Sequence, residues 1–289
     1  MHAPPFRDRV VHHALMSAAG PVLERGAIAH SYACRAGRGQ HAALRQVRHW
    51  IRPGQWFLKL DVEKFSDSVD HALLRALLAR RFRERRLLAL FGRLIDSYAH
   101  RPEKGLPIGA LTSQYLGNFY LDPFDHWVTQ TRRVRRYLRY MDDLLFFGDH
   151  DELLVLREEA AALLDGLGLR IKDGGVLNRS ELGVPYLGFV LYPDRTRLNA
   201  MGRRRLRRRM KELERSFEKR RIGEKELCAR GEALFAHARF GDDLGWRRMA
   251  AGFSRLREAQ EPSPRLAGRL VEQPSRELPL RVSQQERPR

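Results

Sequence analysis

The chain has 289 residues and a formal charge of +19, from 54 Lys or Arg residues against 35 Asp or Glu residues. This surplus predicts a polyanionic partner, either for a nucleic-acid enzyme or for a structural nucleic-acid protein such as a ribosomal protein. The hydrophobic content of 43% favours the enzyme, because it is enough for a sizeable core. Two cysteines, Cys34 and Cys228, indicate neither a disulfide framework nor a cysteine zinc site. The lack of an apolar run of 18 residues and of a signal-peptide pattern predicts a cytoplasmic protein with no membrane partner.

The first part of the chain is predicted to form two short helices, residues 10–20 and 40–51, joined by a glycine-rich turn over 36–39. Gly37 and Gly39 would free backbone N–H groups to face a phosphate just before the second helix. A simple helix-leading turn with an exposed arginine explains the same spacing equally well. The pattern leaves both interpretations open.

A single acid, Asp61, lies inside the apolar run of the segment WFLKLDVEKFSDSVDH. The run predicts a buried strand over residues 56–62. The polar residues that follow offer turn and N-cap chemistry, so a helix is expected to start near His71. Residues 71–99 are expected to form two helices, the second with an apolar face.

The loop GLPIG, residues 105–109, precedes a predicted amphipathic helix over 112–128. Pro123 is expected to kink or interrupt this helix because it has no backbone N–H. Gly109 lets the backbone approach a ligand closely. Gln114, one turn into the helix, can hydrogen-bond a base or a sugar.

The segment RRYLRYMDDLLFFGD, residues 135–149, predicts a β-hairpin with Asp142 and Asp143 at its turn. Adjacent carboxylates at the tip of an apolar hairpin are costly unless a cation neutralises them, and Mg²⁺ prefers such oxygen ligands. A polar turn without a metal is the alternative interpretation. Phosphoryl transfer with two metals needs carboxylates from more than one strand, and Asp61 supplies the third.

Beyond the hairpin, an amphipathic helix over 151–167 leads into a predicted strand over 169–172. The order of strand, helices, hairpin, helix and edge strand is typical of a split βαβ fold. After residue 199 the sequence RRRLRRRMKELERSFEKRR predicts a basic helix with a narrow apolar stripe. This helix either lies along duplex phosphates or is a solvated helix face. Residues 224–253 are expected to complete a small helical domain, and residues from 259 onward to be disordered.

Four blocks of this sequence, in order, resemble blocks of bacterial reverse transcriptases. The two catalytic blocks are matched by LKLDVEKFSDSVDH and RYMDDLLFF, the nucleotide-binding block by GLPIGALTSQYLGNFYLDPFDHWV, and the primer-grip hairpin by VPYLGFVLYP. The central block carries Ile108-Gly109 and Ser113-Gln114, where group II intron enzymes, another similar group, carry Gln-Gly and Ser-Pro. This variant is similar to the enzymes of diversity-generating retroelements, and PPFRDRVVHHAL and SYACRAGRGQHAA fit the same group.

The resemblance implies an α+β polymerase right hand with a split βαβ palm, partial helical fingers and a helical thumb. The expected domains are partial fingers over 1–52, the palm with the remaining fingers helices over 53–197, a basic helical thumb over 198–258 and a disordered basic tail over 259–289. Family members normally carry more fingers sequence before PPFRDRVVHHAL. The resemblance therefore implies that the N-terminal fingers are missing here.

The implied activity is RNA-directed DNA synthesis, in which deoxynucleotides are added to a primer 3′ end with two Mg²⁺ ions, which Mn²⁺ can replace. The expected partners are an RNA template, a DNA primer, deoxynucleoside triphosphates and an accessory protein of a retroelement. The implied catalytic residues are Asp61, Asp142 and Asp143, and the implied metal site adds Val62. The implied nucleotide-binding residues are Arg35, Arg38, Phe65, Ser66, Gly109 and Gln114. The implied primer and duplex contacts are Tyr140, Met141, Tyr186, Leu187, Gly188, Arg203, Arg204, Arg207 and Arg208.

Two further positions depart from the family pattern. Ser66 stands at position five after the catalytic aspartate, where an aromatic residue usually excludes a ribose 2′ hydroxyl, and Phe65 precedes it. Gly175 stands where a lysine usually follows the edge strand, and only Lys172 is nearby. Two other function classes stay open: a non-catalytic nucleic-acid-binding scaffold, and a polymerase that uses ribonucleotides or extends ends without a template.

Overall fold

The computed structural model describes residues 5–98, 100–107 and 109–242. The chain forms two compact units, one up to Val184 and the other from Pro185. The boundary falls inside the predicted palm, residues 53–197, at the start of the predicted primer-grip hairpin.

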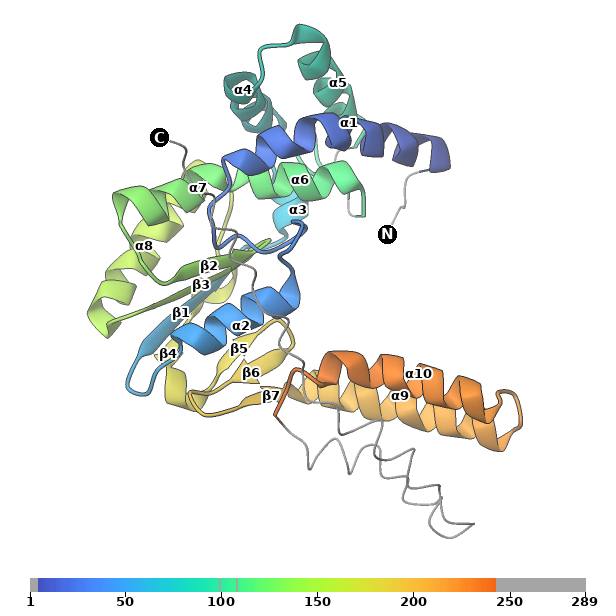
Figure 1. The fold of residues 1–289 in the computed structure, drawn as a ribbon. Helices are drawn as coiled ribbons and strands as arrows, with labels where there is room; N and C mark the ends of the chain where they lie inside the picture. Colours follow the sequence, from blue (N-terminus) through green and yellow to red (C-terminus); the bar gives the residue numbers. More distant parts are fainter. Residues whose placement is uncertain (1–4, 99, 108, 243–289) are drawn as a thin grey trace, which may run out of the picture. The chain divides into compact units, whose positions relative to one another are not determined.

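A four-stranded antiparallel sheet lies at the centre of the first unit, with the strand order β2-β3-β1-β4 (Figure 1). β1 (Trp56–Asp61) and β3 (Asp143–Gly148) are the middle strands, and their large apolar residues are buried on both faces of the sheet. β2 (Tyr137–Tyr140) and β4 (Val176–Arg179) are the edge strands. Strands and helices packed on one another in this order confirm the predicted α+β class.

The predicted strand over 169–172 is wrong. Leu169 is buried in the core, and Ile171 makes only an isolated bridge with the residue that follows β1. The chain then passes through a 3₁₀ turn (Lys172–Gly174), and three consecutive residues from Asp173 onward have positive φ. This left-handed backbone redirects the chain, so pairing with β1 begins only at β4.

The other helices of the first unit are α1 (Phe6–Arg25), α2 (Gln40–Trp50), α3 (Phe65–Ser68), α4 (His71–Arg81), α5 (Arg85–Asp96), α6 (Leu111–Tyr120), α7 (Asp122–His126) and α8 (His150–Gly166), with a π-helical turn at Trp127–Thr131 and a 3₁₀ turn at Ser180–Leu182. α8 packs against β1 and β3, and α1 packs along α6 (Figure 1). Leu156 and Leu164 of α8 share one hydrophobic core with Leu58 and Phe146 of the sheet. This core holds the sheet that carries the candidate site.

Local sequence signals explain where several helices begin and end. The Asp70 side chain accepts a hydrogen bond from the Leu73 backbone N–H at 3.0 Å, so α4 starts at His71 as predicted. The predicted helix over 112–128 is interrupted as expected, since α6 ends at Tyr120 and α7 carries Pro123 in its first turn.

Up to residue 242, the second unit has a three-stranded sheet in the order β5-β6-β7 and two helices that pack on each other. Its basic helix begins where Asn199 caps the Gly202 backbone N–H at 2.7 Å, and Leu206, Met210 and Leu213 form its buried stripe as predicted. The end of the predicted helical domain and the predicted tail over 259–289 lie outside the described residues. No helix in the described part of the chain is long and apolar enough to cross a membrane. The elements are β5 (Val184–Tyr186), β6 (Phe189–Leu191), β7 (Thr196–Leu198), α9 (Ala200–Glu218) and α10 (Glu224–Ala238).

Candidate active site

The three predicted catalytic aspartates meet at one end of the central sheet. Asp61 is the last residue of β1 and lies directly opposite Asp143, the first residue of β3. Met141 and Asp142 form the two-residue turn between β2 and β3, with Met141 at φ 54°. The Val62 backbone N–H donates to the Asp142 carbonyl at 3.4 Å, which ties the turn to the end of β1.

Lys59 is a fourth charged residue of this site, which the sequence interpretation did not include. Its Nζ lies 2.8 Å from Oδ1 of Asp143. Side chains two residues apart on a strand share one face, so Lys59 lies on the same side of β1 as Asp61. A lysine inside the otherwise apolar run of β1 was the available sequence signal.

The electrostatics of the turn favour an added cation. Burial raises the pKa of Asp142 above its ordinary value, and the carboxylates of Asp143 and Asp61 raise it further, whereas Lys59 lowers it. One lysine therefore offsets only part of the negative charge of three carboxylates.

The donor atoms at the turn fit Mg²⁺ by their chemistry. In the described residues, no group of three or more His, Cys, Asp or Glu side chains is arranged to hold a metal ion by itself. Mg²⁺ in phosphoryl-transfer sites is usually bound by one or two carboxylates together with substrate phosphates and water. Asp61 and Asp142, with the Val62 carbonyl, are a donor set of that kind.

A fully buried ion pair lies beneath the turn. Arg139 of β2 and Asp125 of α7 both have an exposed fraction of 0%, and Arg139 Nη2 lies 2.6 Å from Asp125 Oδ2. Arg139 Nε also donates to both Asp125 oxygens, at 2.9 and 3.0 Å, and the Tyr137 hydroxyl donates to Oδ1 at 2.6 Å. Burial of a guanidinium is costly without such a partner, so the pair fixes β2 on α7.

Arg139 also supports the turn directly. Its Nη1 donates to the Met141 carbonyl at 3.1 Å and to Asn118 Oδ1 at 2.9 Å. Asn118 in turn donates to the Ala33 carbonyl at 2.9 Å. Neither Asp125 nor Arg139 was assigned a role from the sequence. The signal for the role of Arg139 was a charged residue at the centre of the predicted strand.

Asp122 is a second buried acid next to this network. Its side chain is 6% exposed, and Oδ2 has no hydrogen-bond partner. Burial raises the pKa of Asp122 to about 6 and repulsion from Asp125 adds to the shift, although Arg139 opposes it.

We expect Asp122→Asn to change how stability depends on pH. The folded state keeps the Asp122 proton up to about pH 6, whereas the unfolded chain loses it near its ordinary pKa of 3.8. The contribution of Asp122 to the free energy of unfolding therefore falls as pH rises through this window and then stays level, for a total of about 3 kcal/mol. The asparagine variant should lack this fall in urea unfolding measured between pH 4 and pH 7. Asp165→Asn, at an exposed position of α8, is the control, and equal pH profiles for parent and Asp122→Asn would contradict the prediction.

The predicted nucleotide-binding arginines have different environments. Arg35 Nη1 donates to the carbonyls of Ile28 and Ser31 at 2.8 and 2.9 Å, which holds the loop after α1. Arg38 is exposed and lies over the Tyr32 ring, 5.5 Å from its centroid. Of the two, Arg38 is the one placed to reach a ligand.

The two residues at the predicted sugar gate also differ. Phe65 is buried, and a Cβ on Gly117 would lie 3.2 Å from its ring and 3.8 Å from the Met141 methyl group. The Phe65 ring and the Met141 methyl group therefore both lie next to α6 at Gly117. Ser66 is half-buried and its carbonyl accepts from the Leu106 N–H at 2.7 Å.

The other predicted site residues of the first unit lie near α6, at the end of β2 and before β4. Gly109 has φ 99° and leads into α6, where Gln114 is half-buried in the first turn. Tyr140, at the end of β2, is half-buried and pairs with Asp143. Gly175 has φ 79°, and a Cβ there would clash with the Leu60 side chain. A lysine therefore cannot take the Gly175 position without a shift of the backbone.

The predicted primer and duplex contacts of the second unit lie on two elements. Tyr186 is buried, and Leu187 and Gly188 form the β5–β6 turn with φ values of 46° and 84°. On α9, Arg204, Arg207 and Arg208 are exposed and Arg203 is half-buried.

Residues 3–191 match the family model described as reverse transcriptase (RNA-dependent DNA polymerase). The chain belongs to this family. The match covers β1, β3, the turn between β2 and β3 and most of the predicted primer-grip hairpin, so it includes all three aspartates of the candidate site.

Curated relatives of this reverse transcriptase chain are distant. Protein YkfC of Escherichia coli is 27% identical over 244 residues, which cover 68% of this chain and 64% of YkfC. Group II intron-encoded protein LtrA of Lactococcus lactis is 27% identical over 139 residues, or 45% of this chain and 22% of LtrA. The structure is also similar to apo telomerase from Candida tropicalis, with a TM-score of 0.49, 12% identity, and coverage of 64% of this chain and 39% of the telomerase chain. The chain thus spans less than two thirds of the length of each of these proteins.

Proposed function

We propose that this chain is an RNA-directed DNA polymerase that adds deoxynucleotides to a primer 3′ end. The observation that carries the proposal is the register of β1 and β3, which pairs Asp61 with Asp143 and puts Asp142 beside them, in a chain of the reverse transcriptase family. Carboxylates from two strands at one site are what phosphoryl transfer with two metals requires.

Asp61, Asp142 and the Val62 carbonyl would hold the two metal ions, Mg²⁺ or Mn²⁺. When bound, these ions supply activation of the primer 3′ hydroxyl and charge stabilisation at the leaving pyrophosphate. Asp143 forms an ion pair with Lys59 and supports the neighbouring metal-binding aspartates. Tyr140 and Met141 pack at the primer end.

Other residues of the chain bind and orient the substrates. Arg38 offers a guanidinium to the triphosphate, and Gln114 a hydrogen bond to the base or sugar. The turn at Leu187 and Gly188 would steady the primer, and α9 would follow the duplex backbone. The partners in this proposal are an RNA template, a DNA primer and deoxynucleoside triphosphates.

Primer extension tests the proposal. The purified chain is given a labelled DNA primer on an RNA template with deoxynucleotides, and with Mg²⁺, with Mn²⁺ or with EDTA. Product is expected only with a metal ion and a template. Extension by one nucleotide type without a template would indicate a terminal transferase instead. Because the chain spans only part of the length of its relatives, a form with upstream sequence from the same reading frame is assayed in parallel.

A second candidate function is nucleic-acid binding without synthesis. It is favoured by the Lys59 ammonium on Asp143, a cation that already offsets part of the charge of the site. The two functions differ in a simple way, since a binding protein retains primer–template in a salt-dependent manner but yields no product with either metal.

Sugar selection is expected to depend on Ser66. An aromatic side chain at this position would block a ribose 2′ hydroxyl, whereas serine leaves room and adds a hydrogen-bonding hydroxyl. Ser66→Phe should raise the kcat/KM ratio of deoxynucleotide over ribonucleotide at least several-fold, about 1 kcal/mol or more. Single-nucleotide insertion measures this ratio, with Ser68→Phe as a control in the same helix. If the parent already rejects ribonucleotides strongly and the variant is unchanged, Phe65 beside Met141 is the better candidate for the gate.

Duplex binding is expected to depend on the arginines of α9. At 100° per residue, Arg203 and Arg207 lie along one side of the buried stripe and Arg204 and Arg208 on the face opposite to it, whereas Arg205 and Arg209 lie along the other side of the stripe. Replacing the first four with Gln should lower the slope of log affinity against log salt by about 0.9 for each lost phosphate contact. A matched comparison removes two charges from each flank, Arg203 with Arg207 and Arg205 with Arg209. Equal slopes for these two variants would favour a solvated helix face.

A further inference from the structure

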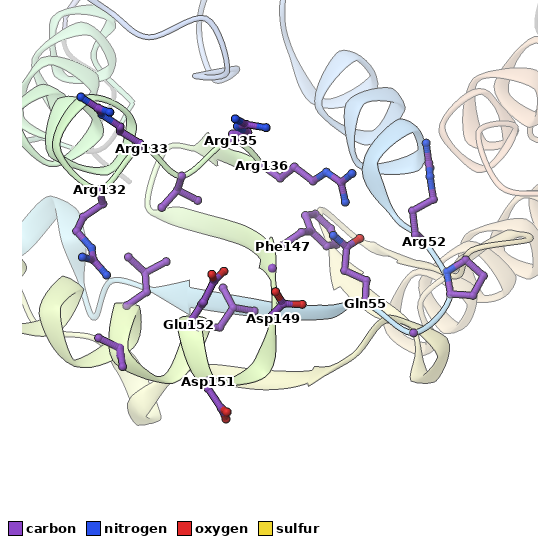
Figure 2. A pocket seen from close by; sticks show the side chains of 17 residues that line it. Arg52, Gln55, Arg132, Arg133, Arg135, Arg136, Phe147, Asp149, Asp151 and Glu152 are labelled. Carbon is purple, nitrogen blue, oxygen red and sulfur yellow. The ribbon is translucent and has the colours of Figure 1, made fainter.

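A groove of about 1060 Å³ lies in the first unit, away from the catalytic turn (Figure 2). It is formed by the segment before β1, the segment before β2 and the first turns of α8. β3 runs from Asp143 at the catalytic turn to Gly148 in the groove, a length of about 17 Å for an antiparallel strand. The groove is therefore at the opposite end of the sheet from the aspartates.

The walls of the groove carry opposite charges. Arginines line the groove from the segments before β1 and before β2, and Asp149, just before α8, and Glu152, in its first turn, project into the groove opposite Arg135 and Arg136 (Figure 2). Asp151 points away from the groove in the same view. The arginines are Arg52, Arg132, Arg133, Arg135 and Arg136.

Three of these arginines, Arg52, Arg132 and Arg136, are held by contacts within the protein. Arg132 Nε lies 2.8 Å from Glu159 Oε2, which ties the segment before β2 to α8. Arg52 Nη1 donates to the Ile51 carbonyl at 2.9 Å. With its amide oriented to satisfy both polar atoms, Gln55 accepts from Arg136 Nη1 at 2.5 Å and donates to the Trp50 carbonyl. These contacts shape the basic wall.

Arg133 and Arg135 differ from their neighbours. Both are exposed, and neither makes a hydrogen bond or ion pair within the part of the chain that the structure describes. Two guanidinium groups without a partner in the described part of the chain favour binding of an anion in the groove. Guanidinium groups match phosphate oxygens in geometry and bind them through paired hydrogen bonds.

The rest of the lining indicates which part of a nucleic acid would bind. Its aromatic residue, Phe147, is buried in the sheet, so no exposed ring of the lining is available to stack on a base. Val155 is an exposed apolar residue of the lining. The acidic wall would repel a phosphate strand and confine it to the arginine side. The groove is thus suited to a sugar–phosphate backbone rather than to bases.

We propose that this groove is a second nucleic-acid site, which binds the phosphodiester backbone independently of the polymerase site. It would hold a helical region of RNA or DNA outside the catalytic cleft. Binding there is insensitive to sequence and sensitive to salt, because it depends on charge contacts with phosphates.

The first experiment locates the bound strand. A photoreactive benzophenone amino acid replaces Val155 in the groove or Ala89 on α5, two exposed positions of the first unit. Each full-length protein is irradiated with labelled RNA duplex, DNA duplex or single-stranded RNA. Crosslinking at position 155 but not at 89 is expected, and the three probes show which nucleic acid the site prefers. Equal crosslinking at both positions, or none at 155, would overturn the proposal.

The second experiment tests the charges. Arg133→Gln with Arg135→Gln should reduce crosslinking at position 155 several-fold and lower the salt slope by about 2 when measured with the preferred probe, about 0.9 for each lost contact. Arg85→Gln with Arg86→Gln, at two exposed positions of α5, removes the same charge and should leave position 155 unaffected. Asp149→Asn with Glu152→Gln should strengthen binding, because the repelling wall is removed. Unchanged crosslinking in the Arg133 and Arg135 variant would contradict the proposal.

An acidic protein segment is the competing occupant of a basic groove. Polyglutamate of matched charge is therefore titrated against the labelled duplex. Weak competition supports the nucleic-acid site. Binding of polyglutamate as tight as that of the duplex, lost in the same arginine variant, would overturn it in favour of an acidic protein partner.

Discussion

Primer extension is expected to disappear when Asp142 and Asp143 are both replaced by alanine, while binding to primer–template duplex is retained. The two carboxylates lie at the catalytic turn beside Asp61, and loss of metal-ligand charge removes several kcal/mol of transition-state stabilisation. Each 1.36 kcal/mol corresponds to a factor of ten, so a fall of about 1000-fold or more is expected. Affinity should persist because it comes mainly from contacts with phosphates.

The measurement is single-turnover extension, with duplex affinity determined by fluorescence anisotropy on the same preparations. Asp61→Asn is a milder substitution, which keeps the shape of the side chain and removes one negative charge from β1, the strand that pairs with β3. Asp165→Asn, on the exposed side of α8, controls for a change of net charge far from the turn. Extension that survives in the Asp142 and Asp143 double variant would refute the assignment of the active site. Loss of extension together with loss of duplex binding would point to misfolding, which thermal unfolding would reveal.

Arg139→Met is expected to destabilise the first unit by about 3 to 5 kcal/mol, because Asp125 is left buried and without its cation. The same change removes the donor to the Met141 carbonyl, so the catalytic turn loses a support. Urea unfolding measures the stability, and extension below the unfolding transition measures the effect on the turn.

A combined variant separates the two roles of Arg139. Asp125→Leu and Tyr137→Phe, added to Arg139→Met, remove the buried charge and the hydroxyl that bonded to it, and fill the space with apolar atoms. Replacement of a whole buried pair by apolar residues is often neutral or stabilising, so much of the lost stability should return. Extension should remain low, since the Met141 carbonyl still lacks its donor. Recovery of extension in parallel with stability would mean that Arg139 acts only through the fold.

The sequence by itself determined those features that depend on neighbouring residues. The apolar run around Asp61 predicted a strand, Asp70 predicted the start of α4, and Pro123 predicted the interruption after α6. The apolar stripe of α9 was predicted from its spacing alone. Periodicity, capping and turn chemistry act within a few residues, so they are visible without a fold.

Only the tertiary structure decided which distant residues meet. The register of β1 and β3 paired Asp61 with Asp143 and brought Lys59 to the same carboxylate. The buried partner of Arg139 came from α7, and the predicted strand at 169–172 did not form because the left-handed backbone from Asp173 onward delays pairing with β1 until β4. A charged residue in a strand is read from sequence as exposed. Its real role depends on whether a partner from elsewhere in the chain offsets the cost of burial, and local sequence carries no record of that partner.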